Sequence, residues 1–340
     1  MVMAKRNYSK RSTKIEPSAM TITFSTPSVT AGTTGNFTID LSQVASLVNR
    51  RFYRQGINWA VGGIKVLTQT NGSIAVHKLP NTWVMANAWE KSMRTWNKMN
   101  REALAETESV RPKFLDFKIY ADAGHHAAGY GSNLLPFAAS GVATAGEWEP
   151  SKVVIPIGAA SPGATGDREI VAVGANFPGI GSSGLDAVSM IEGYAASRGL
   201  PNVLDPNVPD DAALVDGFNP QNWMAAIFNE GTDQTTDVME DMISENNIAP
   251  YPFENDGVNT DTMYPGGANQ LSGLQVHDST TYGATTIGGT TRLKGGNFPC
   301  GLIKITHNVA ADSEAHNVVL YVDLVPGHHR GYLCEPMTEM

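Results

Sequence analysis

The chain has 340 residues, of which 17% are charged, and it contains 34 glycines, 19 prolines and only 2 cysteines. This length suffices for one large domain or two, and the glycine and proline content is typical of a loop-rich β protein. Two cysteines, Cys300 and Cys334, exclude a disulfide framework and a four-cysteine zinc site. No apolar run reaches the ~18 residues of a membrane span.

The net charge of −9 conceals an uneven distribution of charge along the chain. Residues 1–118 hold 17 of the 24 Lys and Arg but only 7 of the 33 acidic residues, a balance of +10, and the remainder has a balance of −19. No Lys or Arg lies between Arg198 and Arg292. This asymmetry predicts one surface suited to a polyanion and another suited to solvent.

Residues 1–18 form a short basic arm with almost nothing apolar to bury, and no apolar segment of a secretory signal follows its charges. We expect a solvated segment that binds nucleic acid; a charged tail with a solubility role is the alternative. The KR-x3-KR spacing also resembles a short nuclear localisation signal. The basic residues of the arm are Lys5, Arg6, Lys10, Arg11 and Lys14.

Two alternating segments, 21–25 and 33–41, predict strands, and the spacing of apolar residues from Ser42 onward predicts a helix. Arg50, Arg51 and Arg54 follow at its end, and we expect them to assist the arm in binding nucleic acid. The next apolar runs, 57–69 and 73–79, are joined through Asn71 and Gly72. Because Asn-Gly is the strongest short hairpin signal, these runs predict a β-hairpin.

From residue 87 the pattern changes to an amphipathic helix with Trp89 and Trp96 on its apolar face. Core packing is the favoured role of these tryptophans, and base stacking is the alternative. Further strands are predicted over 114–120, 152–157 and 169–173, and helices over 186–198 and within 220–246.

Residues 199–291 are rich in Pro, Asn, Asp and Gly, and predict an exposed acidic insertion between strands. The β pattern returns at 300–306 and 317–325. About nine short strands with long, helix-bearing connections predict an all-β fold: a single jelly-roll antiparallel β-sandwich with helices in its inter-strand loops. We therefore expect an arm, 1–18, and one domain, 19–340.

Two histidine pairs, His125-His126 and His328-His329, are candidates for a zinc site, although neighbours on an extended strand point to opposite faces. We expect no resident cofactor or metal. Carboxylates in the acidic stretches have spacings that calcium could use, and calcium held between subunits is the alternative to a solvated acidic surface. These weak calcium candidates are Asp237, Asp241, Asp256 and Asp261.

Several segments resemble the capsid proteins of small circular Rep-encoding single-stranded DNA viruses, of the environmental and marine type. These are NTWVMANAWEKSMRTWNKMN (81–100), FLDFKIYAD (114–122) and YVDLVPGHHRGYLCEPMTEM (321–340). The resemblance implies a jelly-roll subunit that assembles with copies of itself into an icosahedral shell around single-stranded DNA. The chain departs from the family in its arm, which has five basic residues where a long Arg- and Lys-rich segment is usual.

The expected function is therefore that of a structural virion protein without enzymatic activity or membrane association, with passage through the host nucleus during assembly. An RNA-virus capsid of the same fold is a second hypothesis. A carbohydrate-binding β-sandwich is a third, with Trp148, Trp223 and Tyr251 as its aromatic platform. A hydrolase is disfavoured because no pair of acids stands out.

Overall fold

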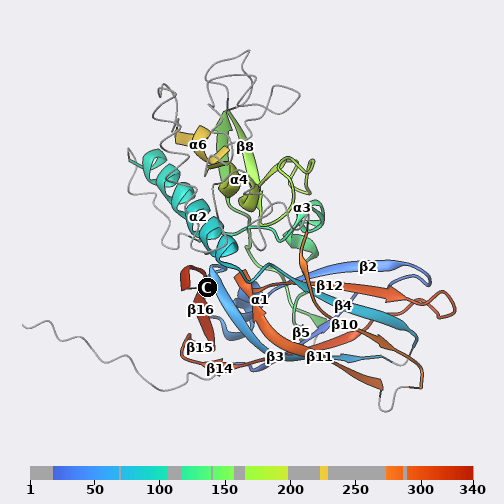
Figure 1. The fold of residues 1–340 in the computed structure, drawn as a ribbon. Helices are drawn as coiled ribbons and strands as arrows, with labels where there is room; N and C mark the ends of the chain where they lie inside the picture. Colours follow the sequence, from blue (N-terminus) through green and yellow to red (C-terminus); the bar gives the residue numbers. More distant parts are fainter. Residues whose placement is uncertain are drawn as a thin grey trace, which may run out of the picture.

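The computed structural model describes residues 18–68, 70–105, 116–138, 141–156, 165–197, 223–228, 273–285 and 289–339. Their main feature is a pair of antiparallel sheets packed against each other (Figure 1). The first sheet has the order β1 (Thr21–Ser25), β13 (Val319–Leu324), β3 (Ile57–Leu67), β11 (Thr290–Phe298), and β16 (Cys334–Pro336) pairs with the start of β3. The second has the order β10 (Gln275–Tyr282), β4 (Gly72–Lys78), β12 (Leu302–Val309), β2 (Thr34–Asp40). The predicted antiparallel β-sandwich is confirmed.

Strands from the two ends of the chain pair with each other in a nested series. β1 pairs with β13, β2 with β12, β3 with β11 and β4 with β10, all antiparallel. The chain alternates between the sheets from β1 to β4, and it alternates again from β10 to β13. The sandwich is thus closed by contacts between residues that lie up to 302 positions apart, such as Thr21 and Asp323.

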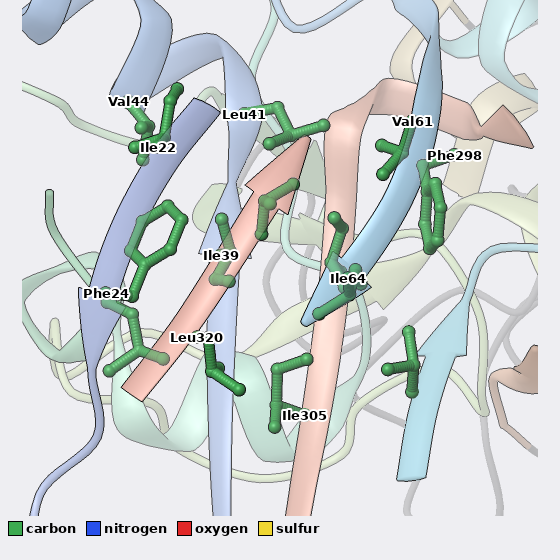
Figure 2. Packing of buried hydrophobic residues seen from close by; sticks show 14 of the residues in the cluster. Ile22, Phe24, Ile39, Leu41, Val44, Val61, Ile64, Phe298, Ile305 and Leu320 are labelled. Carbon is green, nitrogen blue, oxygen red and sulfur yellow. The ribbon is translucent and has the colours of Figure 1, made fainter. Parts of the chain in front are cut away.

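Alternation of apolar and polar residues explains which side chains enter the sandwich. Ile22 and Phe24 of β1 point inward with a polar neighbour between them, and Ile39 and Ile305 enter from the opposite sheet. Figure 2 shows these side chains meeting Leu320 between the two layers. Each is at most 3% exposed, and burial of such a side chain stabilises the fold by roughly 1.5–3 kcal/mol.

The predicted hairpin at Asn71 and Gly72 is wrong. β3 pairs with β11 and β13, whereas β4 pairs with β10 and β12, so the turn carries the chain from one sheet to the other. The Asn71 side chain accepts a hydrogen bond from the N–H of Ala284 (2.8 Å), and its carbonyl accepts one from Ala310 (3.2 Å). The Asn-Gly signal indicated a reversal correctly, but both strands have partners from distant parts of the chain.

A long insertion between β4 and β10 carries most of the helices and lies at one end of the sandwich (Figure 1). It begins with α2 (Trp83–Ala103), shortly after β4 ends at Lys78. The expected insertion at 199–291 therefore starts too late, and it wrongly includes β10, which pairs with β4 in the sandwich. Most of 199–272 lies outside the described residues.

The insertion contains a small sheet and its own apolar core. β7 (Lys152–Pro156) pairs antiparallel with β8 (Thr165–Val171), and β9 (Ala187–Ser189) pairs parallel with β8. Helices α2, α4 (Met190–Ser197) and α6 (Trp223–Phe228) contribute to the same core. The predicted strands 152–157 and 169–173 match β7 and β8, while the predicted helix 186–198 begins with β9.

Helix α2 confirms the amphipathic pattern read from the sequence. The Thr82 hydroxyl caps its first turn by accepting from the N–H of Met85 (3.4 Å). Trp89 is 5% exposed, and both Trp89 and Trp96 contact Phe117, with ring centroids 6.1 and 5.7 Å apart. The structure thus supports core packing for Trp89, whereas Trp96 is only partly buried.

The predicted strand at 114–120 is wrong for its described part. Residues 116–119 form no strand, and Tyr120 makes only an isolated bridge with Val171. The reason is that the Gln55 side chain takes the place of a neighbouring strand. Its Oε1 accepts from the N–H of Ile119 (2.6 Å), and its Nε2 donates to the carbonyl of Ile119 (3.1 Å).

The remaining elements are short. They are α1 (Leu41–Asn49), α3 (Ala123–Ala128), β5 (Phe137–Ala138), β6 (Gly141–Val142), β14 (Pro326–Gly327) and β15 (Gly331–Tyr332), with 3-10 turns at Tyr130–Ser132, Pro299–Gly301 and Met337–Glu339. Among the helices in the described ranges, none has both the length and the apolar character needed to span a membrane.

Replacing Gly72 with Ala should destabilise the sandwich by about 1–3 kcal/mol, because a Cβ there would lie 2.5 Å from the carbonyl oxygen of Asn308 and 2.5 Å from the hydroxyl of Tyr282. Denaturant unfolding measures the change. Gly131→Ala is the matched control, since its Cβ would meet nothing within 4 Å and its expected effect is within about 0.5 kcal/mol. Equal midpoints for the two variants would contradict the close packing of this turn.

Candidate nucleic-acid interface

The three arginines predicted to bind nucleic acid lie on the segment between α1 and β3. Helix α1 ends at Asn49, and Arg50 adopts a left-handed conformation (φ 53°) that turns the chain away from the helix axis. Arg50 and Arg54 are exposed, and Arg51 is half-buried. The structure therefore places these three cationic side chains within one short surface segment.

The first described residues are held beside this segment. The guanidinium of Arg51 donates to Ser18 Oγ (3.3 Å), and Ser18 Oγ donates to the carbonyl of Arg330 (2.9 Å). The carbonyl of Ala19 accepts from the hydroxyl of Tyr332 (2.8 Å). The chain that precedes Ser18 therefore joins the domain at the arginines. The predicted arm residues Lys5, Arg6, Lys10, Arg11 and Lys14 lie outside the described residues.

Arg330 belongs to the same surface, although the sequence analysis did not select it. It is exposed in the turn between β14 and β15, with a left-handed conformation (φ 51°). Its guanidinium donates to the carbonyl of Phe52, and its carbonyl accepts from the hydroxyl of Tyr53 (2.9 Å). The signal in the sequence that could have indicated an exposed turn at Arg330 is the run GHHRG, which has a glycine at each end. We call Arg50, Arg51, Arg54 and Arg330 the arginine cluster.

A buried acidic group lies close to the arginine cluster. Burial raises the pKa of Asp116, and the positive charges of Lys118 and Arg54 oppose that rise. The Lys118 ammonium lies 2.8 Å from the Asp116 carboxylate and 4.5 Å from the ring centre of Trp148. The Lys118 ammonium is therefore held between the Asp116 carboxylate and the Trp148 ring. Arg54 is not part of this ion pair.

The segment that carries Arg50, Arg51 and Arg54, called the arginine segment below, is anchored to the insertion through Asp40. This carboxylate caps α1 by accepting from the N–H groups of Ser42 (2.9 Å) and Gln43 (3.3 Å). It also accepts from Gln55 Nε2 (3.0 Å) and from Trp148 Nε1 (3.0 Å). Burial raises the pKa of Asp40 to about 6, although all four hydrogen bonds act to lower it. The bond to Asp40 thus fixes the position of Gln55, which directly follows Arg54 in the chain.

His125 extends this buried polar network. Its Nδ1 accepts from the N–H of Ala121 (3.1 Å), so its Nε2 carries the proton and donates to Asn133 Oδ1 (2.8 Å). Asn133 Nδ2 then donates to Gln43 Oε1 (3.0 Å). Burial lowers the pKa of His125 to about 4. The network therefore links α3 of the insertion to α1 of the sandwich with a neutral imidazole at its centre.

The histidine pairs are not placed as a zinc site would need. His125 and His126 lie on helix α3 rather than on an extended strand, and His126 Nε2 is 3.0 Å from Glu169 Oε2, both buried. His328 and His329 occupy the turn between β14 and β15. Within the part of the chain that the structure describes, no group of three or more His, Cys, Asp or Glu side chains could hold a metal ion.

Two other sets of candidate residues were predicted, an aromatic platform for carbohydrate and a group of calcium ligands. Trp223 is 0% exposed and donates to the carbonyl of Ser189 (3.2 Å), so it cannot form part of an exposed aromatic platform. Trp148 is half-buried and held by Asp40, and Tyr251 lies outside the described residues. The calcium candidates Asp237, Asp241, Asp256 and Asp261 also lie outside the described residues.

Comparisons with known proteins do not assign this interface. Neither the models of protein families, nor the curated proteins, nor the solved structures contain a match to this chain. The functional argument therefore depends on the residues and their geometry.

His125→Gln should reduce the loss of stability in acid. The unfolded chain binds a proton at His125 near pH 6.5, whereas the folded chain binds it only near pH 4, so stability is lost as the pH falls through this window. The free energy of unfolding lost between pH 7 and pH 4 should be about 3 kcal/mol smaller in the variant. Denaturant titrations at the two pH values measure it.

Asp40 has the opposite sign, because its raised pKa adds stability as the pH falls from about 6 towards 3.8. In the wild type, the stability that Asp40 adds in acid therefore offsets part of the stability that protonation of His125 removes. In His125→Gln the Asp40 contribution remains without that loss. His328→Gln, which removes an exposed imidazole outside this network, is the control. The same acid loss in His125→Gln as in wild type would mean that this imidazole is charged in the folded protein.

Proposed function

We propose that this chain is a viral capsid protein that assembles with copies of itself into an icosahedral shell and packages single-stranded DNA. The nested pairing of the eight sandwich strands carries the proposal. A chain that pairs its first strand with its last, and each inner strand with the corresponding one, is a long antiparallel ribbon folded over into two sheets. We infer from this order a single jelly roll, which contains eight strands in two Greek keys.

Viral capsid and lectin domains are both built on jelly rolls, so the fold alone does not separate them. Charge favours the capsid. Two members of the arginine cluster, Arg51 and Arg330, hydrogen-bond Ser18, where a segment with five further cations joins the domain. A lectin reading needs aromatic rings in the open, and the burial of Trp223 removes one of the three rings suggested for such a platform.

Cations in this arrangement suit sequence-independent packaging. Lys and Arg that neutralise phosphates release counterions from the strand, which gives salt-dependent binding without base recognition. Many identical subunits in a closed shell convert a weak contact per subunit into a strong total attachment. We propose that the arm and the arginine cluster face the packaged strand and that the acidic part of the chain faces outward or lines subunit contacts. We expect the protein to occur in virions and to assemble in the host nucleus.

Expression of the full chain followed by electron microscopy tests the assembly. Closed particles that protect nucleic acid from added nuclease are expected. Sensitivity of the extracted nucleic acid to DNase, and its resistance to RNase, would distinguish DNA from the RNA-virus alternative. A monomer at every salt concentration and pH tried would refute the capsid function.

Replacing Lys5, Arg6, Lys10, Arg11 and Lys14 with Gln should reduce packaging while shells still form. The slope of log K against log salt for a single-stranded oligonucleotide should become less steep by up to ~3.5, because each of the five lost phosphate contacts changes it by about 0.7. Arg292→Gln, on the exposed face of β11, is the control for a change of charge alone. If the arm variant fails to assemble, the arm is a structural clamp between subunits.

A further inference from the structure

A cavity of about 670 Å³ opens between the arginine segment and helix α2. Its aromatic lining includes Trp89 and Trp96 of α2, Phe117 of the segment before α3, and Phe52 of the segment before β3. Arg54 and Arg330, both exposed, also line this cavity. One hollow therefore combines several aromatic side chains with two arginine side chains.

Polar groups in the cavity retain hydrogen-bonding capacity. The indole N–H of Trp89 is buried and has no acceptor among the described residues. Asn97, half-buried on α2, lines the cavity, and so does Asp116, whose side chain is 4% exposed. The Trp89 N–H is enclosed by protein atoms, so Asn97 and Asp116 supply the polar groups beside the two arginines.

The ligand that this combination fits is planar, apolar on its faces, polar at its edge and anionic at one end. Aromatic side chains beside arginines are the usual platform for single-stranded nucleic acid, because every base has a face that can stack and a phosphate that can pair. We propose that this cavity binds one nucleotide of the packaged strand, with its base against Trp96 and its phosphate on Arg54 and Arg330. The proposal rests on the packaging function inferred above.

Other occupants fit less well. The arm of a neighbouring copy carries five cations, and like charges on Arg54 and Arg330 would repel it. A neutral sugar can stack on tryptophan but gains nothing from two arginines. Charge complementarity therefore selects an anionic aromatic ligand, and Ser18, the first described residue, donates a hydrogen bond to the carbonyl of Arg330, which lines the cavity.

Calorimetric titration of the full chain with dAMP and with inorganic phosphate tests the role of the base. We expect dAMP to bind about tenfold more tightly than phosphate, because stacking adds to the ionic contact. Equal affinities would show an anion on exposed arginines and would overturn the proposal. Binding of methyl glucoside that is unaffected by Arg54→Gln would overturn it as well, by assigning the cavity to a neutral carbohydrate.

Two variants localise the binding. Asn97→Trp fills the cavity from α2 and should abolish the difference between dAMP and phosphate. Arg54→Gln should weaken dAMP binding at least about fivefold, whereas Arg101→Gln removes an exposed arginine of the same helix away from the cavity and should leave it unchanged. Arg54→Gln keeps the test decisive if Asn97→Trp does not fold, because Arg54 is exposed.

The outcomes separate this proposal from the packaging function. If particles form and protect nucleic acid while dAMP binds no better than phosphate, packaging stands and the nucleotide cavity is refuted. If dAMP binds in the cavity but no nucleic acid is recovered from any particle, the cavity is a nucleotide site and the packaging function is refuted.

Discussion

The buried carboxylate of Asp40 connects three parts of the molecule. It accepts hydrogen bonds from the start of α1, from Gln55 beside the arginines and from Trp148 of the insertion. A buried carboxylate without such donors would be strongly destabilising, so these groups are held in one arrangement. The raised pKa of Asp40 indicates that desolvation outweighs the four bonds.

From this point the geometry of the candidate interface follows. Gln55 binds both Asp40 and the backbone of Ile119, which fixes the chain on either side of the cavity. Arg54 and Phe117 lie one and two residues from these anchors and both line the cavity. The arginine segment is therefore positioned by buried polar contacts behind it, while its cations remain exposed to a partner.

Periodicity predicted six of the eight sandwich strands, all but β10 and β11, and the long helix α2, because each depends on a local pattern of apolar residues. It failed at Asn71-Gly72, where the reversal was real but the strands turned to different sheets. It also failed at residues 116–119, whose alternating pattern is satisfied by a glutamine side chain in place of a strand. Arg330 was missed because it meets the arginines only in the folded chain, through bonds to Ser18, Phe52 and Tyr53, all more than 270 positions away from it.

The sequence by itself determined the β-rich class, the amphipathic helix and the separation of positive from negative charge, since these follow from composition and from spacing along the chain. Only the tertiary structure decided which strands pair, where the arm joins the domain and which aromatic side chains face Arg54 and Arg330. The physical reason is that strand pairing and buried hydrogen bonds join residues far apart in the chain. Many such partners satisfy the same local pattern, and the packing of the whole domain selects one.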